Sequence, residues 1–296
     1  MNHPVVCFGE VLWDILPTGE TPGGAPLNVA YHLHKLGLNP ALITRVGRDE
    51  KGAALEAIFK EQGVCTNYFQ WDAAHETGKV YAQLKENNEV VYDIVQPSAW
   101  DFIEWNEDLQ KLVAGAQAFI FGSLAARSEV SANTLYRLLE TAQLKVLDIN
   151  LRAPHYTQKG LEDILTKADI LKLNEAELQL VSGWSVHSTK LEDRVQAVAD
   201  KYKLQTVVVT LGGAGAYLYK DGKGYQHPGF AVTVKDTIGS GDAFLAGLLS
   251  MLLAGENPDV ALALANGMGA FVATKAGGCP VYDVEQVRER MASKNV

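Results

Sequence analysis

Short runs of apolar, β-branched residues alternate with longer amphipathic stretches along most of the chain. The pattern predicts strands at 5–8, 41–45, 118–122, 145–150, 170–173, 206–211 and 216–219. It predicts helices at 28–36, 51–62, 129–142, 240–254 and 259–275. Alternation of strands and helices is typical of a mostly parallel sheet with helices on both faces, so the expected fold class is α/β.

Two segments depart from this alternation. Residues 10–19 continue past the first strand without a helical pattern, and residues 79–94 contain two strand-like runs around a polar turn at 86–88. The second pattern predicts a β-hairpin, hence a small sheet outside the main one. Such a hairpin either covers a ligand site as a lid or decorates the surface. We expect a single domain over 1–296, with lid segments at about 11–22 and 77–96.

The composition indicates a sizeable hydrophobic core and argues against two classes of partner, nucleic acids and membranes. Of 296 residues, 47% are hydrophobic, and the formal net charge is −9. Because nucleic acids and anionic membranes bind clustered Lys and Arg, this acidic chain is not expected to bind either. The longest apolar run, Ala243 to Ala254, is shorter than the roughly 20 residues that a membrane span needs.

The N-terminus and the cysteines favour a cytoplasmic location. The first residues lack the basic and apolar regions of a signal peptide. Cys7, Cys65 and Cys279 are odd in number and far apart in the sequence. This spacing fits a reducing compartment, and neither a disulfide framework nor a zinc site.

The first segment with candidate chemistry is 235–244, which follows a strand-like run at 231–234. Gly239, Ser240 and Gly241 lie where the next helix begins, and backbone N–H groups at a helix start can bind an anion. Asp242 lies in the same first turn. It either deprotonates a hydroxyl that attacks a phosphoryl group, or only stabilises the helix start.

The second segment is 23–33, near the beginning of a helix. Gly23 and Gly24 allow the backbone to approach a ligand closely. Asn28 can both donate and accept hydrogen bonds, and Asp14 stands upstream where the small sheet begins. A carboxylate and an amide together can form hydrogen bonds with both hydroxyl groups of a vicinal diol. Alternatively, Asn28 is a helix cap and Asp14 a turn residue.

Several common motifs are absent. The chain has no G-x-x-x-x-G-K-[ST], no complete G-x-G-x-x-G and no H-E-x-x-H. A P-loop is therefore excluded, and a dinucleotide fingerprint is unsupported. A catalytic metal held by protein ligands alone is not expected, since the seven histidines are scattered.

Segments 23–37 and 236–244 together resemble the two signatures of the ribokinase-like (PfkB) carbohydrate kinases, the second being D-[ST]-x-G-[AS]-G-D-x-F. Motifs at 46–52, 148–152, 174–177 and 210–215 follow in order, so the resemblance covers essentially the whole chain. Segments 9–14, 23–30 and 150–152 look most like those of fructokinases. No clear glutamate follows residues 121–124, which weighs against ribose as substrate.

The resemblance implies a three-layer α/β/α domain with a small β-sheet lid. It also implies transfer of the γ-phosphoryl group of Mg-ATP to a primary hydroxyl of a sugar, with D-fructose as the expected acceptor. A kinase for another sugar, a sugar acid or a nucleoside remains an alternative, as does a non-catalytic protein that binds sugar or nucleotide. A homodimer through the outer face of the lid is also considered, with Val80, Ala82, Leu84 and Val91 on that face.

The resemblance also implies a role for each matching residue. For the reaction, Asp242 matches the catalytic base, and the helix start matches the anion hole, with residues Gly239, Ser240 and Gly241. The sugar-binding positions are Asp14, Gly24 and Asn28, and Arg152 lies where relatives contact phosphate or substrate. The family's motif more often has alanine at the position of Ser240. A serine there leaves the backbone amide intact.

Further matching residues concern the nucleotide and cations. The nucleotide-binding positions are Asn174, Thr210, Gly212, Gly215 and Asn266. Glu177 is expected to hold Mg²⁺ through water. Asp236 and Ile238, with the loop near Gly278, resemble the monovalent-cation site of some members, so K⁺ is a candidate. Trp13 and the segment 97–100 either stack on a base or pack the lid onto the body.

Overall fold

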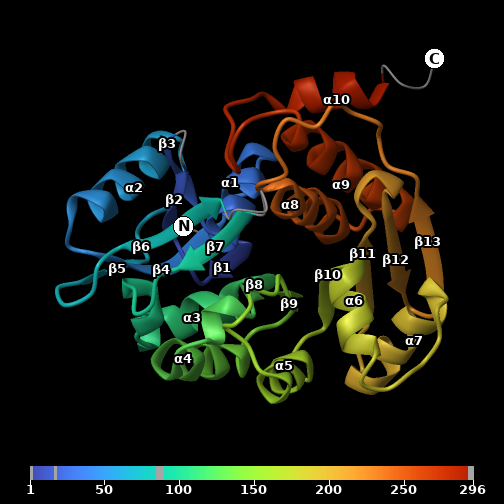
Figure 1. The fold of residues 1–296 in the computed structure, drawn as a ribbon, viewed down its shortest axis with the longest axis horizontal. Coiled ribbons are helices and arrows are strands. Elements are labelled where there is room, and N and C mark those ends of the chain that lie inside the picture. The colour runs from blue at the N-terminus through green and yellow to red at the C-terminus, as the bar shows by residue number, and fades with distance from the viewer. Residues whose placement is uncertain (1–2, 17–18, 85–89, 293–296) are drawn as a thin grey trace.

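The computed structural model describes residues 3–16, 19–84 and 90–292. It describes no side chain from residue 82 to residue 92, both included. Within these residues, nine strands form one sheet in the order β13-β12-β11-β10-β9-β8-β1-β4-β5 (Figure 1). Neighbouring strands from β11 to β5 are parallel, whereas β12 and β13 are antiparallel additions at one edge. The strands are β1 (Val5–Phe8), β4 (Ala41–Gly47), β5 (Phe69–Asp72), β8 (Ala118–Gly122), β9 (Lys145–Asp148), β10 (Ile170–Asn174), β11 (Thr206–Thr210), β12 (Ala216–Lys220) and β13 (Lys223–His227).

Helices cover both faces of this sheet, as the alternation of elements predicts. Side chains alternate along β1: Val6 and Phe8 face one core cluster, and Val5 and Cys7 face the other. The first cluster is covered by α3 (Glu107–Gly115), α4 (Glu129–Leu139), α5 (Gln158–Leu165), α6 (Glu175–Ser182) and α7 (Leu191–Tyr202). The second is covered by α1 (Ala25–Lys35), α2 (Glu50–Glu61), α8 (Ser240–Leu253), α9 (Pro258–Ala273) and α10 (Val284–Ala292).

A separate small sheet has the strand order β3-β2-β6-β7 in the described part of the chain. Its strands are β2 (Leu12–Leu16), β3 (Gly19–Gly23), β6 (Gly78–Leu84) and β7 (Val90–Ile94). β6 and β7 pair antiparallel, so the expected hairpin is confirmed, although its turn at 86–88 lies outside the described residues. The α/β fold class with a second, smaller sheet is thus confirmed.

Two expectations about these elements are wrong. Residues 231–234 form no strand, because the segment pairs with no neighbour in the described chain and Val234 is 57% exposed. The next backbone N–H groups, of Lys235 and Asp236, donate to Ala273 O at the end of α9. Val80 does not lie on the outer face of the small sheet: it is 6% exposed and packs inward. Ala82, Leu84 and Val91 lie outside the described side chains.

The small sheet packs onto the body through a compact apolar cluster. Leu12, Val80 and Ile94 from the small sheet contact Trp100 and Leu124 from the body. Trp100 is fully buried, so it packs the small sheet against the body rather than presenting a free ring to a ligand.

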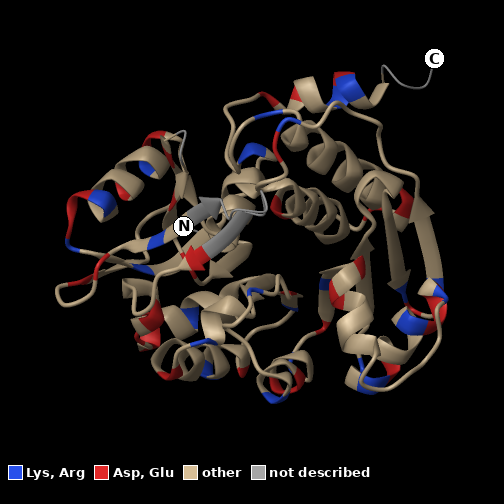
Figure 2. Ribbon diagram, in the orientation of Figure 1, with Lys and Arg blue, Asp and Glu red and all other residues tan. Residues whose placement is uncertain are grey.

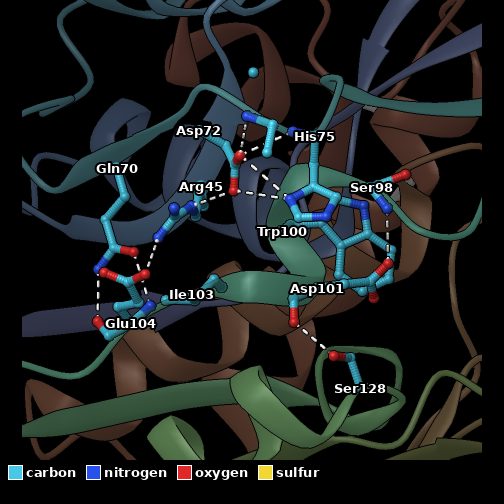
Figure 3. Close-up of polar contacts among 12 residues, drawn as sticks. Arg45, Gln70, Asp72, His75, Ser98, Trp100, Asp101, Ile103, Glu104 and Ser128 are labelled. Atoms are coloured by element: carbon cyan, nitrogen blue, oxygen red, sulfur yellow. Dashed lines mark hydrogen bonds and ion pairs between the residues drawn. The ribbon is translucent and has the colours of Figure 1, made fainter.

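The 3₁₀ turn that carries Trp100, η1 (Ala99–Phe102), is held by polar contacts around it (Figure 3). The Ser98 backbone N–H donates to Asp101 Oδ2 at 2.9 Å, and Ser128 Oγ donates to the Asp101 carbonyl at 2.6 Å. Nearby, Arg45 Nε pairs with Asp72 Oδ2 at 2.7 Å, which joins β4 to β5 at the sheet edge. The base of the small sheet is therefore attached to a fixed part of the body.

Candidate active site

A cleft of about 460 Å³ lies between the carboxyl ends of the parallel strands and the inner face of the small sheet. Ligand sites in open α/β sheets commonly lie at this end of the strands. Eleven of the residues singled out by the sequence line it: Asp14, Gly24, Asn28, Arg152, Asn174, Glu177, Thr210, Ile238, Gly239, Gly241 and Asp242.

Asp242 lies at the bottom of the cleft, in the first turn of α8. The N-cap Gly239 has φ 73°, and a Cβ there would lie 2.4 Å from Gly278 Cα, so the helix start requires glycine. The Asp242 side chain is 8% exposed, and its Oδ2 accepts a 2.7 Å hydrogen bond from Asn28 Nδ2. A buried carboxylate therefore stands beside the helix-start amides, of which the Ser240 N–H already donates to the Thr237 carbonyl at 3.2 Å.

The electrostatic surroundings of Asp242 suit a proton acceptor. Burial, together with the charge of Asp148, raises the pKa of Asp242 to about 6. Lys172 and the hydrogen bond from Asn28 act in the opposite direction. The carboxyl is therefore ionised at neutral pH but more basic than an ordinary aspartate.

An ion pair between Lys172 and Asp148 lies beside Asp242. The sequence analysis did not single out either residue as part of the site. Lys172 Nζ is 2.7 Å from Asp148 Oδ2, and both side chains are almost buried. Burial opposes the charge of Lys172, but Asp148 and Asp242 outweigh it, so the pKa of Lys172 is raised. The available signal was a lysine within the otherwise apolar strand 170–173.

Two further carboxyl groups lie toward the small sheet. Burial raises the pKa of Asp14 to about 6, although Arg152 lowers it. Burial raises the pKa of Glu10 to about 7, and Asp242 adds to the effect. Glu10 is 3% exposed, and its Oε2 has no hydrogen-bond partner among the described residues. Sequence reasoning missed Glu10, which lies two residues after the end of the first strand.

Asn174 and Glu177 form a capping box at the start of α6. Asn174 Oδ1 accepts from the Glu177 N–H at 2.9 Å, and Glu177 Oε2 accepts from the Asn174 N–H at 2.8 Å. Glu177 Oε1 accepts from the Leu151 N–H at 2.8 Å. Because each oxygen uses one lone pair, the carboxylate can still accept from metal-bound water, which fits Mg²⁺. No cluster of three or more metal-ligating side chains occurs in the described residues.

The remaining predicted residues lie outside the lining of the cleft. Ser240 Oγ donates to Gly269 O at 2.9 Å, and Asn266 Nδ2 donates to Leu262 O at 2.8 Å, so both side chains are used within the helix pair α8–α9. Asp236 accepts from the backbone N–H groups of Ile238 and Gly277, each at 3.0 Å. Gly212 and Gly215 lie in the turn between β11 and β12.

The chain matches the family model described as pfkB family carbohydrate kinase over residues 8–283. A fructokinase from Klebsiella pneumoniae is 33% identical over 298 residues, which cover 94% of this chain and 95% of that relative. A fructokinase from Vibrio cholerae O395, solved with fructose, ADP and calcium, is 27% identical, with a TM-score of 0.84 and coverage of 97% and 98%. Its double mutant, solved with fructose, ADP and potassium, is 26% identical, with a TM-score of 0.84 and coverage of 97% of both chains.

Proposed function

The chain belongs to the pfkB family of carbohydrate kinases, and we propose that it is a fructokinase that transfers the γ-phosphoryl group of ATP to D-fructose. The observation that carries the proposal is the buried Asp242 carboxylate at the start of α8, hydrogen-bonded to Asn28 inside the cleft. The names of the relatives, and the fructose and ADP in the Vibrio cholerae enzyme, support fructose as acceptor and ATP as donor.

In the proposed reaction, Asp242 accepts the proton of the C6 hydroxyl, and that oxygen attacks the γ-phosphorus in line with the leaving ADP. The product is fructose 6-phosphate. The backbone amides of Gly239, Ser240 and Gly241 stabilise the charge of the transferring group. Positioning and electrostatic stabilisation supply most of the catalysis in phosphoryl transfer.

The sugar and the nucleotide occupy opposite ends of the cleft in this proposal. The sugar contacts Asp14, Gly24, Asn28 and Arg152, and the small sheet closes over it as a lid of a single domain, which limits ATP hydrolysis by water. The nucleotide-binding residues are Asn174, Thr210, Gly212, Gly215 and Asn266.

Two cations belong to the proposal. Mg²⁺ bound through water near Glu177 would neutralise phosphate charge, as it does in other phosphoryl transfers. The oxygens around Asp236 and Ile238 are the proposed K⁺ site, and the potassium in the Vibrio cholerae double mutant supports this choice.

The proposal also covers the oligomeric state of the protein and its location in the cytoplasm. A homodimer through the small sheet is proposed, and sedimentation that shows only a monomer would remove it. Among the residues that the structure describes, no helix is long and apolar enough to cross a membrane. Cys7, Cys65 and Cys279 are all free, which is the state that a reducing cytoplasm maintains.

The test is ADP release from Mg-ATP with a panel of acceptors: fructose, ribose, 2-keto-3-deoxygluconate, tagatose 6-phosphate, fructose 6-phosphate and adenosine. Stimulation by fructose far above the other members is expected. Stimulation by a different member would retain the kinase and replace the substrate. Normal ATP binding without stimulation by any acceptor would favour a non-catalytic binding protein.

A further inference from the structure

A chain of two hydrogen bonds links the segment after α9 to the catalytic carboxylate. Asn28 stands between the two ends: its Nδ2 donates to Asp242 Oδ2 at 2.7 Å, and its Oδ1 accepts from Cys279 Sγ at 3.1 Å. Asn28 is 3% exposed, so water does not readily replace either partner. The thiol therefore contacts the same amide that contacts the base.

The segment that carries the thiol is fixed against the helix that carries Asn28. Tyr31 Oη, on α1, donates to the Pro280 carbonyl at 2.7 Å. His32, also on α1 and fully buried, has Nε2 at 2.8 Å from the Gly278 carbonyl and Nδ1 at 2.9 Å from Tyr282 Oη. These contacts lie one turn along α1 from Asn28, and they hold the Cys279 side chain close to the amide.

Glycine at 278 leaves the space that the amide occupies. A Cβ at this position would lie 2.7 Å from Asn28 Nδ2 and 2.9 Å from both Cγ and Oδ1. Real side chains do not approach this closely, so a larger residue would displace the amide. Cys279 thus supplies the hydrogen-bond donor for Asn28 Oδ1, and Gly278, the residue before it, leaves room for the amide.

The thiol can act only as a donor in this arrangement. Burial raises the pKa of Cys279 well above its ordinary value, and Asp242 contributes, so the sulfur keeps its proton. An amide rotated by 180° would place Oδ1 against the carboxylate oxygen and its N–H groups against the S–H. Both contacts would then be unfavourable, because each pairs like with like.

We propose that Cys279 is a positioning residue for phosphoryl transfer: its S–H fixes the Asn28 amide in the orientation that donates to Asp242. The inference rests on the proposed function, because it concerns the base of that reaction. It assigns the thiol no contact with substrate, and no covalent chemistry.

Loss of the S–H should change how Asp242 titrates. The Asn28 hydrogen bond lowers the pKa of Asp242, so a disordered amide should raise it. A base with a raised pKa is protonated at higher pH, so the acid limb of the kcat profile should move upward. The other charged or titratable groups that act on this carboxyl from neighbouring elements are unchanged in such a variant, namely Asp148, Arg152, Lys172 and Glu10.

The first test compares three substitutions at one position with a matched cysteine elsewhere. Cys279→Ala and Cys279→Val remove the donor, with and without loss of volume, and Cys279→Ser retains an O–H. Cys65→Ala, at a free cysteine outside the lining of the cleft, is the control. Each full-length variant is checked by thermal melting, and kcat and the KM values for fructose and for ATP are measured from pH 5 to 9.

We expect kcat near pH 7 to fall roughly threefold to tenfold in Cys279→Ala and Cys279→Val, the range for loss of one hydrogen bond. The acid limb should move upward by about half a pH unit, with the KM for ATP unchanged. Cys279→Ser and Cys65→Ala should resemble the parent. The proposal is overturned if the acid limb stays in place in folded Cys279→Ala and Cys279→Val, or if Cys279→Ser behaves as they do.

A second measurement separates this inference from the choice of substrate. The Asp242 carboxyl is titrated by ¹³C NMR in protein labelled at aspartate, with its signal assigned through Asp242→Asn. This reports on the carboxyl without any turnover. Fructose inactivity combined with an upward titration in Cys279→Ala would refute fructokinase and retain the positioning role. Normal fructose turnover combined with an unchanged titration in Cys279→Ala would retain fructokinase and refute the positioning role.

Discussion

At the scale of single residues, Asp242 is open to two interpretations that mutation can separate. If it is the base, Asp242→Asn should lower kcat by at least ~10²-fold, with small changes in KM, because the amide cannot accept the proton. If it only stabilises the helix start, the amide should retain most of the activity.

Asp259→Asn is the matched control for this prediction. Asp259 also lies in the first turn of a helix, α9, but it is exposed and outside the cleft. Steady-state kinetics with Mg-ATP and fructose should show near-parental turnover for this variant. Comparable losses in the two variants would indicate that both carboxylates act through helix stability.

Glu10 carries a cost in stability that depends on pH. Its pKa is raised from an ordinary 4.5 to about 7, so the folded state favours the protonated form. Stability is therefore lost as pH rises through about 7, and it is retained below 4.5. Glu10→Gln removes the buried charge, and we expect it to stabilise the protein by about 1–3 kcal/mol at pH 8.

Urea unfolding at pH 8 and at pH 4.5 measures this effect. The gain in the free energy of unfolding should shrink greatly at the lower pH, where the carboxyl is protonated in the folded parent and about half protonated in the unfolded chain. Glu61→Gln, at an exposed glutamate that ends α2, is the control and should change little at either pH. An equal gain at both values would contradict a charge effect.

At the scale of elements, the start of α8 depends on a contact between two loops. A Cβ at Gly239 would lie 2.4 Å from Gly278 Cα, and φ is 73°. Gly239→Ala should therefore cost about 2 kcal/mol or more of stability, since backbone must shift in addition to the left-handed strain. It should also lower kcat at least tenfold, because the shift moves the helix-start amides.

Gly255→Ala separates the two causes. Gly255 follows α8 with a similar φ of 78°, but nothing lies within 4 Å of an added Cβ. Its variant should lose only about 1 kcal/mol and keep its activity. Thermal melting and kinetics on both variants check this expectation, and equal activity in the two would show that the loop contact does not matter.

The elements themselves were predictable where periodicity was strong. The segment 240–254 matches α8, and 259–275 matches α9 to within two residues. The run 231–234 has strand composition but forms no strand, because a strand also requires a partner that sequence alone does not show. Edge elements such as β5 and β13, with mixed side chains, were not predicted for the same reason.

At the scale of the whole molecule, topology brings together residues that are far apart in the sequence. Asp148 ends β9, Lys172 lies on β10, and Glu10 follows β1, and parallel order places these ends at one edge of the sheet. The signature motifs predicted most of the lining. They did not show where the side chains of Ser240 and Asn266 form their hydrogen bonds, because the packing of α8 on α9 sets those contacts.

Charge over the whole molecule leads to a prediction about metal removal. Basic and acidic residues are interspersed over the surface helices (Figure 2), but the cleft is unbalanced. Its lining has two cationic side chains, of Arg152 and Lys172, against five carboxyl groups, of Glu10, Asp14, Asp148, Glu177 and Asp242. A free polyphosphate should be repelled, and Mg²⁺ should relieve this repulsion.

We therefore expect ATP to bind at least ~10-fold more weakly in EDTA than in excess Mg²⁺, as measured by calorimetry without turnover. Fructose, which is uncharged, is the internal control, and its affinity should be the same in both buffers. If ATP binds equally well in EDTA, then the two cations and the helix-start amides neutralise the phosphates unaided. If fructose affinity also falls, the metal stabilises the cleft itself rather than the nucleotide.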